Sequence, residues 1–362
     1  MATADGTWAY RDRFGDSFGR TYFRRFPPGV CSSIGIGTYL GEPTDRVDGA
    51  YREAIETALE NGINHVDTAI NYRCQRSERI VGEALRRTDV DRESIVVATK
   101  GGFLPFDGER PDDPGSYIRE QFVEPGVVDP ASLVRGSHSL EPGFISEMVD
   151  RSLSNLGVET IDCYYLHNPE TQLLDVDHES LYDQLEAAFE LLERRRAAGE
   201  IGGYGLATWQ AFRVPQPHQQ YLSLPAVIER AEAAAERIGV ESHGLQAIQL
   251  PFNVAMADAF TVNSQPTDGG PVSALEYAHE SGLSVVTSAS IGQGDLAAAI
   301  PPAVDAELSG DTAAQRAINF ARSAPGVTTS LVGMRSVDHV AENVAAGTFD
   351  PLGASAFDTV FE

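Results

Sequence analysis

The sequence predicts a closed parallel (β/α)8 barrel, the TIM-barrel class of α/β folds. Short apolar runs typical of buried strands alternate with longer stretches whose apolar residues recur every three or four positions, as in amphipathic helices. Eight such strand–helix units follow one another within 362 residues. Repeated alternation favours a parallel sheet, and eight units in this length favour a barrel over an open sheet. We expect a single domain over residues 1–362.

Each expected strand is a short run rich in apolar and β-branched residues. The eight runs are SIGIGT (33–38), NHVDT (64–68), SIVVATK (94–100), DCYYLH (162–167), GGYGLAT (202–208), LQAIQLPF (245–252), LSVVTSA (283–289) and TTSLVGM (328–334). A helical pattern follows each run. The clearest places Leu181, Leu185, Ala188, Phe189 and Leu192 on one helical face. A second helix is expected from the spacing of Ile145, Val149, Leu153 and Leu156.

Two segments lie outside the eight units. Residues 1–32 form an N-terminal extension, in which 20–32 predict a hairpin that turns at Pro27-Pro28-Gly29 and caps the bottom of the barrel. Residues 101–140 form a long, acidic connection rich in Pro and Gly after the third strand. A connection of this length is usually a lid or binding loop, and a disordered insertion is the alternative.

The composition narrows the classes of partner. The formal net charge is −26, and such a surface repels nucleic acid and anionic membranes. We find no apolar run long enough to span a bilayer and no secretory signal, so a cytoplasmic location is expected. The acid-rich, lysine-poor chain resembles proteins of salt-in halophiles, with an acidic mesophile protein as the alternative. Cys31, Cys74 and Cys163 match no disulfide or zinc spacing, so no metal site is expected.

Polar residues follow three consecutive strands at the ends where such barrels carry their chemistry. Asp67 is the last residue but one of the second run, Lys100 ends the third and His167 the fourth, and Tyr72 lies five residues beyond Asp67. Each could have a structural role alone, but their common position predicts a site. Lys100 is also the only lysine of the chain.

These motifs resemble the aldo-keto reductase family. GINHVDTAINYR followed by SER, VVATK, YYLHNP, GYGLATW, QLPFN and LVGMRSVDHVAEN are similar to the family's motifs and occur in the family's order, from about residue 30 to 345. The resemblance implies reduction of an aldehyde or ketone, with sugars among the candidate substrates, to an alcohol, or the reverse oxidation.

The same resemblance implies a role for each of the four polar residues. Tyr72 would be the general acid that protonates the carbonyl oxygen. Lys100 would lower the pKa of the phenol, Asp67 would hold Lys100 by a salt bridge, and His167 would orient the substrate carbonyl by a hydrogen bond.

For the cofactor, the resemblance implies NADP(H), with NAD(H) as the alternative. The residues at the corresponding positions are Thr208, Gln249, Ser288, Arg335, Ser336, His339, Glu342 and Asn343. Gln249 would bind the nicotinamide carboxamide, and Arg335 with the N-terminus of the last helix would bind a phosphate. Thr208, Ser288 and His339 replace a more usual asparagine, tyrosine and arginine, which leaves the choice between the two cofactors open.

Two other functions compete with a reductase. Lys100 could form a Schiff base, as in barrel aldolases, or the barrel could be a non-catalytic nucleotide sensor. We expect the substrate to be a small carbonyl compound or alcohol. It should contact the loops that follow the strands, at residues 101–140, 168–178, 209–223 and 253–272. Arg73, Trp209 and Phe252 are the candidate contacts in or next to these loops.

Overall fold

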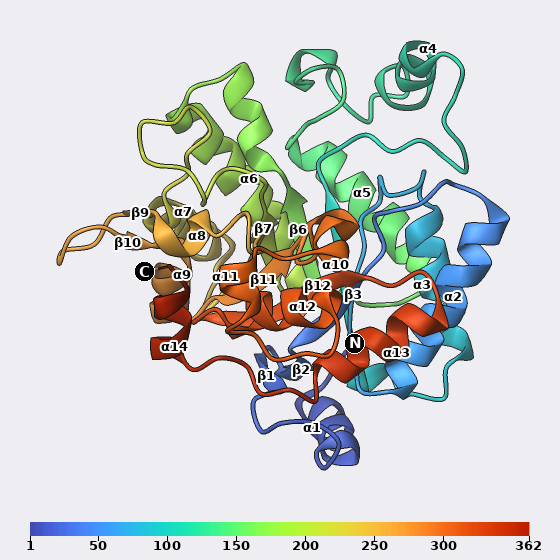
Figure 1. Ribbon diagram of the computed structural model, residues 1–362. Coiled ribbons are helices and arrows are strands. Elements are labelled where there is room, and N and C mark those ends of the chain that lie inside the picture. The colour runs from blue at the N-terminus through green and yellow to red at the C-terminus, as the bar shows by residue number, and fades with distance from the viewer. Residues whose placement is uncertain (362) are drawn as a thin grey trace.

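Eight parallel strands form a closed barrel in the computed structural model, which describes residues 1–361 (Figure 1). The strands follow one another around the barrel in chain order, and the last pairs with the first. They are β3 (Ile34–Gly37), β4 (His65–Asp67), β5 (Val96–Gly101), β6 (Cys163–His167), β7 (Tyr204–Ala207), β8 (Leu245–Pro251), β11 (Ser284–Ser288) and β12 (Val327–Gly333). Each overlaps one of the eight predicted runs, so the predicted fold class is confirmed.

Helices surround the barrel on its outer face. The longer ones are α2 (Asp45–Glu60), α3 (Arg76–Arg87), α5 (Pro142–Leu156), α6 (His178–Ala197), α7 (Leu224–Ile238), α9 (Ala274–Glu280), α12 (Ala313–Ser323) and α13 (Val337–Ala346). Short helices are α4 (Pro114–Ile118), α8 (Asp258–Thr261), α10 (Asp295–Ala298), α11 (Pro302–Asp305) and α14 (Ala354–Asp358). Short 3₁₀ segments cover Arg92–Ser94, Pro130–Ser132, Pro169–Leu174, Gly292–Gly294 and Thr359–Phe361. The residues Arg119–Val123 form a π-helical turn.

The helix α6 shows why the predicted helices form. Its predicted apolar stripe, from Leu181 to Leu192, is buried against the barrel. The Asp177 side chain accepts a hydrogen bond from the Ser180 backbone N–H at 2.9 Å and caps the first turn. Arginines 194 to 196 occupy the last turn, where cations favour the helix dipole.

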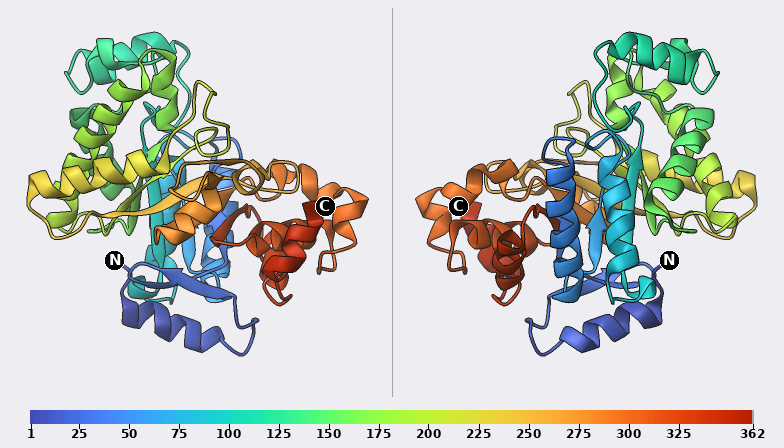
Figure 2. Two further views of the ribbon diagram at one scale, coloured as in Figure 1. Left: turned by 90° about the vertical axis from the view of Figure 1, so that its left-hand side faces the viewer. Right: turned by 90° about the vertical axis from the view of Figure 1, so that its right-hand side faces the viewer.

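The N-terminal extension closes the bottom of the barrel (Figure 2). The predicted hairpin is confirmed: β1 (Phe23–Phe26) pairs with β2 (Gly29–Ser32), and Phe26 and Cys31 join the cluster of side chains inside the barrel. A helix that the sequence did not predict, α1 (Ala4–Phe14), packs beside the hairpin. The Tyr10 hydroxyl donates a hydrogen bond to the Leu59 carbonyl at 2.5 Å and ties α1 to α2.

The connection between β5 and α5 projects from the opposite end of the barrel (Figure 2). It contains α4, and backbone hydrogen bonds close its base: Leu104 N–H donates to Ser137 and Ser139 N–H to Gly102, both at 2.9 Å. Across residues 1–361, no helix combines the length and apolar character that a membrane crossing requires.

Candidate active site

A cavity of about 630 Å³ opens at the carboxyl ends of the barrel strands. Every barrel strand, or the loop that follows it, contributes at least one lining residue. This convergence follows from the fold, because the carboxyl ends of all eight parallel strands meet at one rim. Residues at the strand ends are therefore brought together around this cavity.

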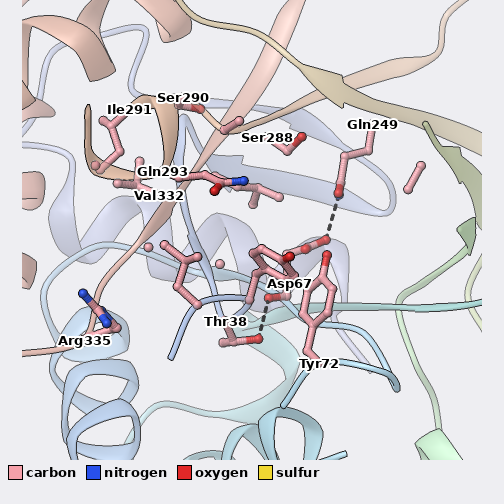
Figure 3. A pocket seen from close by; sticks show the side chains of 18 of the residues that line it. Thr38, Asp67, Tyr72, Gln249, Ser288, Ser290, Ile291, Gln293, Val332 and Arg335 are labelled. Carbon is pink, nitrogen blue, oxygen red and sulfur yellow. Dashed lines mark hydrogen bonds between the residues drawn. The ribbon is translucent and has the colours of Figure 1, made fainter. Parts of the chain in front are cut away.

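A buried ion pair joins Lys100 of β5 to Asp67 of β4. Both side chains are at most 3% exposed, and the Lys100 ammonium donates to Asp67 Oδ1 and to the Thr68 carbonyl, the latter at 2.8 Å. Gln249, from β8 across the barrel, donates its Nε2–H to the other oxygen, Asp67 Oδ2, at 2.8 Å (Figure 3). Burial lowers the pKa of Lys100 and raises that of Asp67, and their mutual attraction opposes both shifts.

Tyr72 stands next to this pair on the cavity wall. The Lys100 Nζ lies 5.2 Å from the centre of the Tyr72 ring, and the Tyr39 ring packs edge-on at 5.0 Å. Burial raises the pKa of Tyr72 well above 10, and the charge of Asp67 raises it further. Any lowering of this pKa by Lys100 is outweighed by burial and by Asp67. The phenol is held in its protonated form.

His167 ends β6 on the other side of Tyr72, with their ring centres 5.8 Å apart. Burial lowers the pKa of His167 well below 6.5, and Lys100 and His138 lower it further, so the imidazole is neutral. Among the described residues, no group forms a hydrogen bond with its Nδ1. The ring is also packed edge-on against Phe103, with centroids 5.2 Å apart.

The long connection helps to hold His167. His138, from the end of that segment, makes a 2.8 Å hydrogen bond from Nε2 to the His167 carbonyl, while its Nδ1 accepts from Gln172 Nε2 at 2.7 Å. This pairing places the His138 proton on Nε2. Burial lowers the pKa of His138 to about 4, which keeps the ring neutral in this role. No sequence pattern pointed to His138, because its partners come from other segments.

The far end of the cavity is built by α13 and the two residues before it, Arg335 and Ser336. Arg335 lies opposite Tyr72, Asp67 and Gln249 across the pocket (Figure 3). Its side chain is exposed, and no carboxylate within residues 1–361 forms an ion pair with it. The Ser336 side chain caps α13 by accepting from the His339 N–H at 3.3 Å. A cation beside a helix N-terminus is suited to bind an anionic group.

The aldo/keto reductase family model matches residues 33–222, which is more than half of the chain. The chain belongs to the aldo/keto reductase family. Among curated relatives, D-threo-aldose 1-dehydrogenase of a Pseudomonas species is 33% identical over 156 residues, 42% of each chain. The NADH-specific methylglyoxal reductase of Escherichia coli is 36% identical over 143 residues, 38% of each chain. The chain thus spans less than half the length of these relatives.

Solved structures of the family share the fold over nearly the whole chain. An aldo-keto reductase from Bacillus halodurans in its holo form superposes with a TM-score of 0.65 at 21% identity, covering 94% of this chain and 96% of that one. An aldo/keto reductase from Klebsiella pneumoniae in complex with NADP and acetate has a TM-score of 0.61 at 16% identity, covering 94% of both. At these identities the likeness concerns the fold.

In this aldo/keto reductase, most of the predicted site residues share the one cavity. The lining includes Asp67, Tyr72, His167, Thr208, Gln249, Ser288, Arg335, His339, Glu342 and Asn343. Lys100 is not part of the lining; it lies behind Tyr72 and Asp67, 1% exposed. Ser336 is also absent from the lining, since its side chain is engaged in capping α13.

Two of the three candidate substrate contacts are placed elsewhere. Phe252 is fully buried and stacks on Phe320, with ring centres 5.7 Å apart, and Arg73 turns away from the cavity into an ion pair with Asp48. Trp209 does line the cavity and is 41% exposed. The expected loop 253–272 contributes no lining residue among those described. This segment itself forms α8 and the small sheet of β9 (Asn263–Gln265) and β10 (Val272–Ser273).

Several lining residues were missed by the sequence analysis. Many of them lie in two segments, 38–40 after β3 and 289–297 after β11, and two others, Tyr51 of α2 and Ala314 of α12, come from helices. Both segments follow barrel strands, so the rule that strand ends form the site would have identified them. Glu170 was missed as well: its buried carboxylate accepts the N–H groups of Trp209 and Gln210 at 2.6 and 2.9 Å, and so holds the loop that carries Trp209.

Proposed function

We propose that this protein is an NADP(H)-dependent oxidoreductase that reduces an aldehyde or ketone to an alcohol, or catalyses the reverse reaction. The observation that carries the proposal is the place of Tyr72 on the cavity wall, between a buried Lys100–Asp67 pair and His167. The family membership, and relatives named as a dehydrogenase of aldoses and a reductase of methylglyoxal, support the same reaction class.

In the direction of reduction, Tyr72 donates its phenolic proton to the carbonyl oxygen. His167, neutral, donates a hydrogen bond to the same oxygen and fixes the orientation of the carbonyl. The hydride that the carbonyl carbon receives would come from a nicotinamide cofactor held in the same cavity. Lys100 stabilises the negative charge that develops on the Tyr72 oxygen as its proton leaves. Asp67 keeps the ammonium in place throughout.

The residues around the cavity suit an elongated, anionic cofactor. Arg335 and the amino end of α13 offer unpaired donors for a phosphate at one end. At the other end Gln249 faces the cavity next to Asp67, with its Nε2 already occupied and its amide oxygen left to accept from a carboxamide. We take Thr208, Ser288, His339, Glu342 and Asn343 as the remaining contacts. The Klebsiella pneumoniae neighbour was solved with NADP, which agrees with this assignment.

The position of Lys100 favours this reaction over Schiff-base chemistry. The amine donates to Asp67 and Thr68 and lies behind the lining, so a carbonyl compound in the cavity meets Tyr72 first. No observation favours a purely nucleotide-sensing role over turnover.

The test is consumption of NADPH with a panel of aldehydes and sugars, at low and at molar KCl. We expect at least one carbonyl compound to be reduced, and Tyr72→Phe to abolish the reaction while NADPH still binds. Binding of NADPH without turnover of any panel member, or full activity of Tyr72→Phe, would reject the proposal.

We further propose a single domain, a cytoplasmic location and adaptation to high salt. The net charge of −26 supports the last of these and disfavours nucleic acid as a partner. A small carbonyl compound or alcohol is the substrate class that the cavity size supports. Within residues 1–361, no group of three or more His, Cys, Asp or Glu side chains is arranged to hold a metal ion, and none has a part in this mechanism.

A further inference from the structure

The turn that follows Tyr72 has an unusual backbone. Arg73, Cys74 and Gln75 have φ angles of 48°, 57° and 66°, and α3 begins directly after them. Residues other than glycine rarely adopt positive φ, and three in succession persist only where their surroundings hold them. The contacts of this turn therefore decide where the Tyr72 ring points.

Arg73 provides the firmest of these contacts. Its side chain is 1% exposed and forms an ion pair with Asp48 of α2. Its Nε and one terminal nitrogen both donate to the Glu42 carbonyl, at 3.2 and 3.0 Å. The guanidinium carbon lies 5.2 Å from the centre of the Tyr51 ring. The remaining terminal nitrogen, Nη1, is buried without a hydrogen-bond partner among the described residues, so Asp48 and the Glu42 carbonyl are the groups that hold this guanidinium.

These contacts connect Tyr72 to a second wall of the cavity. Glu42 ends the segment after β3 that carries Tyr39 and Leu40, both lining residues. Tyr51, against which Arg73 packs, donates its hydroxyl to the Leu40 carbonyl at 2.7 Å. The Tyr39 ring in turn packs on the Tyr72 ring. Arg73 thus joins two walls that meet at the proposed general acid.

The other end of the turn is attached to the long connection after β5. Gln75 Nε2 donates to the Phe106 carbonyl at 3.0 Å, and the Gly108 N–H donates to the Cys74 carbonyl at 2.9 Å. Asn155 of α5 donates to Gln75 Oε1 at 3.1 Å. The turn is therefore held from both sides, and Arg73 is its only charged contact with α2.

We propose that Arg73 is a positioning residue: by fixing the left-handed turn, it aims the Tyr72 hydroxyl at the reacting carbonyl and keeps the Tyr39 wall against it. Arg73 does not line the cavity, so its effect passes through Tyr72 and not through contact with substrate. The inference rests on the proposed function, in which Tyr72 is the proton donor.

Arg76 offers a matched control. It binds the same carboxylate, with Nε donating to Asp48 Oδ2 at 2.7 Å, but it is the first residue of α3 and its side chain is 22% exposed. Arg73→Met leaves Asp48 paired with Arg76, and Arg76→Met leaves it paired with Arg73. Arg76→Met also loses an ion pair with the exposed Asp45, but only Arg73→Met loses the contact that holds the turn.

The first readout is single-turnover hydride transfer, with NADPH affinity measured in parallel by tryptophan fluorescence. We expect Arg73→Met to slow hydride transfer about 10- to 100-fold, as small misplacements of reacting groups do, with little change in NADPH affinity. Arg76→Met should stay close to the wild-type rate. Arg73→Lys should recover part of the loss, since it restores the charge but not the fork. Equal rates for Arg73→Met and Arg76→Met would overturn the proposal.

The second readout does not depend on activity. In the turn, the Tyr72 N–H donates to the Ala69 carbonyl and the Arg76 N–H to the Arg73 carbonyl. Arg73→Met should open these hydrogen bonds more often, so hydrogen–deuterium exchange of a peptide spanning residues 70–76 should speed up in that variant and not in Arg76→Met. If the wild type reduces no carbonyl compound, the proposed function fails, and this comparison still decides the role of Arg73. Unchanged exchange in Arg73→Met would refute it.

Discussion

The two ends of the cavity differ in the burial and pairing of their charged side chains. At the tyrosine end, formed by Asp67, Tyr72, Lys100 and His167, the charged groups are buried and paired with each other. At the arginine end, formed by Arg335 and the first turn of α13, the cation is exposed and has no ion-pair partner among the described residues.

The physical cause of this difference is the cost of leaving a charge without partners. A buried ammonium or carboxylate must be paired within the protein, so the tyrosine end is assembled before any ligand binds. An exposed guanidinium and helix N-terminus are satisfied by water, and can exchange that water for a phosphate. One end is therefore preorganised for reaction, and the other is completed by its ligand.

The largest expected effect comes from breaking the tyrosine end. Lys100→Met and Tyr72→Phe should each slow single-turnover hydride transfer by about 10²–10⁴-fold, the usual contribution of general acid–base catalysis. NADPH binding should change little, because the arginine end is intact. Lys100→Arg should be nearly as slow, since a planar fork cannot replace a compact ammonium between Asp67 and the Thr68 carbonyl.

The residues of this end should also act as a unit. A Lys100→Met, Tyr72→Phe double variant is expected to be little slower than either single one. If Lys100→Met kept most of the wild-type rate, with NADPH absorbance as the readout, the tyrosine end would have to be assigned another role.

Breaking the arginine end should affect binding and not chemistry. Arg335→Ala removes a charged hydrogen bond of about 1.5–3 kcal/mol, so the KM for NADPH should rise about 10- to 100-fold and the KM for NADH much less. The rate at saturating NADPH should stay near wild type. Equal effects on the two cofactors in steady-state assays would exclude contact between Arg335 and a 2′-phosphate.

A substitution of His65 tests how burial in the barrel below the tyrosine end affects the pH dependence of folding stability. His65 of β4 is fully buried, and no described residue pairs with either ring nitrogen; burial, together with Lys100, lowers its pKa from 6.5 to about 3. Below pH 6.5 the unfolded chain therefore binds a proton that the folded chain does not, so folding stability falls as the pH falls towards 3. His65→Leu should remove this loss.

At pH 5 this lowered pKa of His65 reduces the free energy of unfolding by about 2 kcal/mol, and at pH 7 the reduction is close to zero. Denaturant unfolding of the wild type and His65→Leu at the two pH values measures it. The difference in unfolding free energy between the two proteins should shift by this amount in favour of His65→Leu at pH 5. An equal difference at both pH values would show that His65 is not held neutral.

Added salt should have the smallest effect of these changes, and it should act on cofactor binding at the arginine end but not on chemistry at the tyrosine end. Raising KCl from tens of millimolar to molar screens the net charge of −26, so Tm should rise by several degrees. The exposed arginine end should bind NADPH more weakly at high salt, while single-turnover transfer at saturating NADPH should not slow. A flat or falling Tm would remove the proposed salt adaptation and leave the enzymatic proposal standing.

The barrel and much of the cavity could be predicted because their signals are local. Each strand is a run with its own apolar pattern, and the place of Asp67, Lys100 and His167 at strand ends follows from chain order alone. The helix α1 was missed because its outer face is polar, and only contacts such as that between Tyr10 and Leu59 show that it packs. His138 was missed since its partners, Gln172 and the His167 carbonyl, lie about thirty residues away.

The sequence by itself determined the fold class, the family resemblance and which side chains follow which strands, because periodicity and motif order are properties of neighbouring residues. Only the tertiary structure decided that Arg73 turns inward to Asp48, that Gln249 reaches Asp67 across the barrel, and that the pKa of Tyr72 is raised. Desolvation and pairing depend on groups supplied by other strands. The Lys100–Asp67 salt bridge was implied by the family resemblance, and the assembled barrel decided that both of its charged groups are buried.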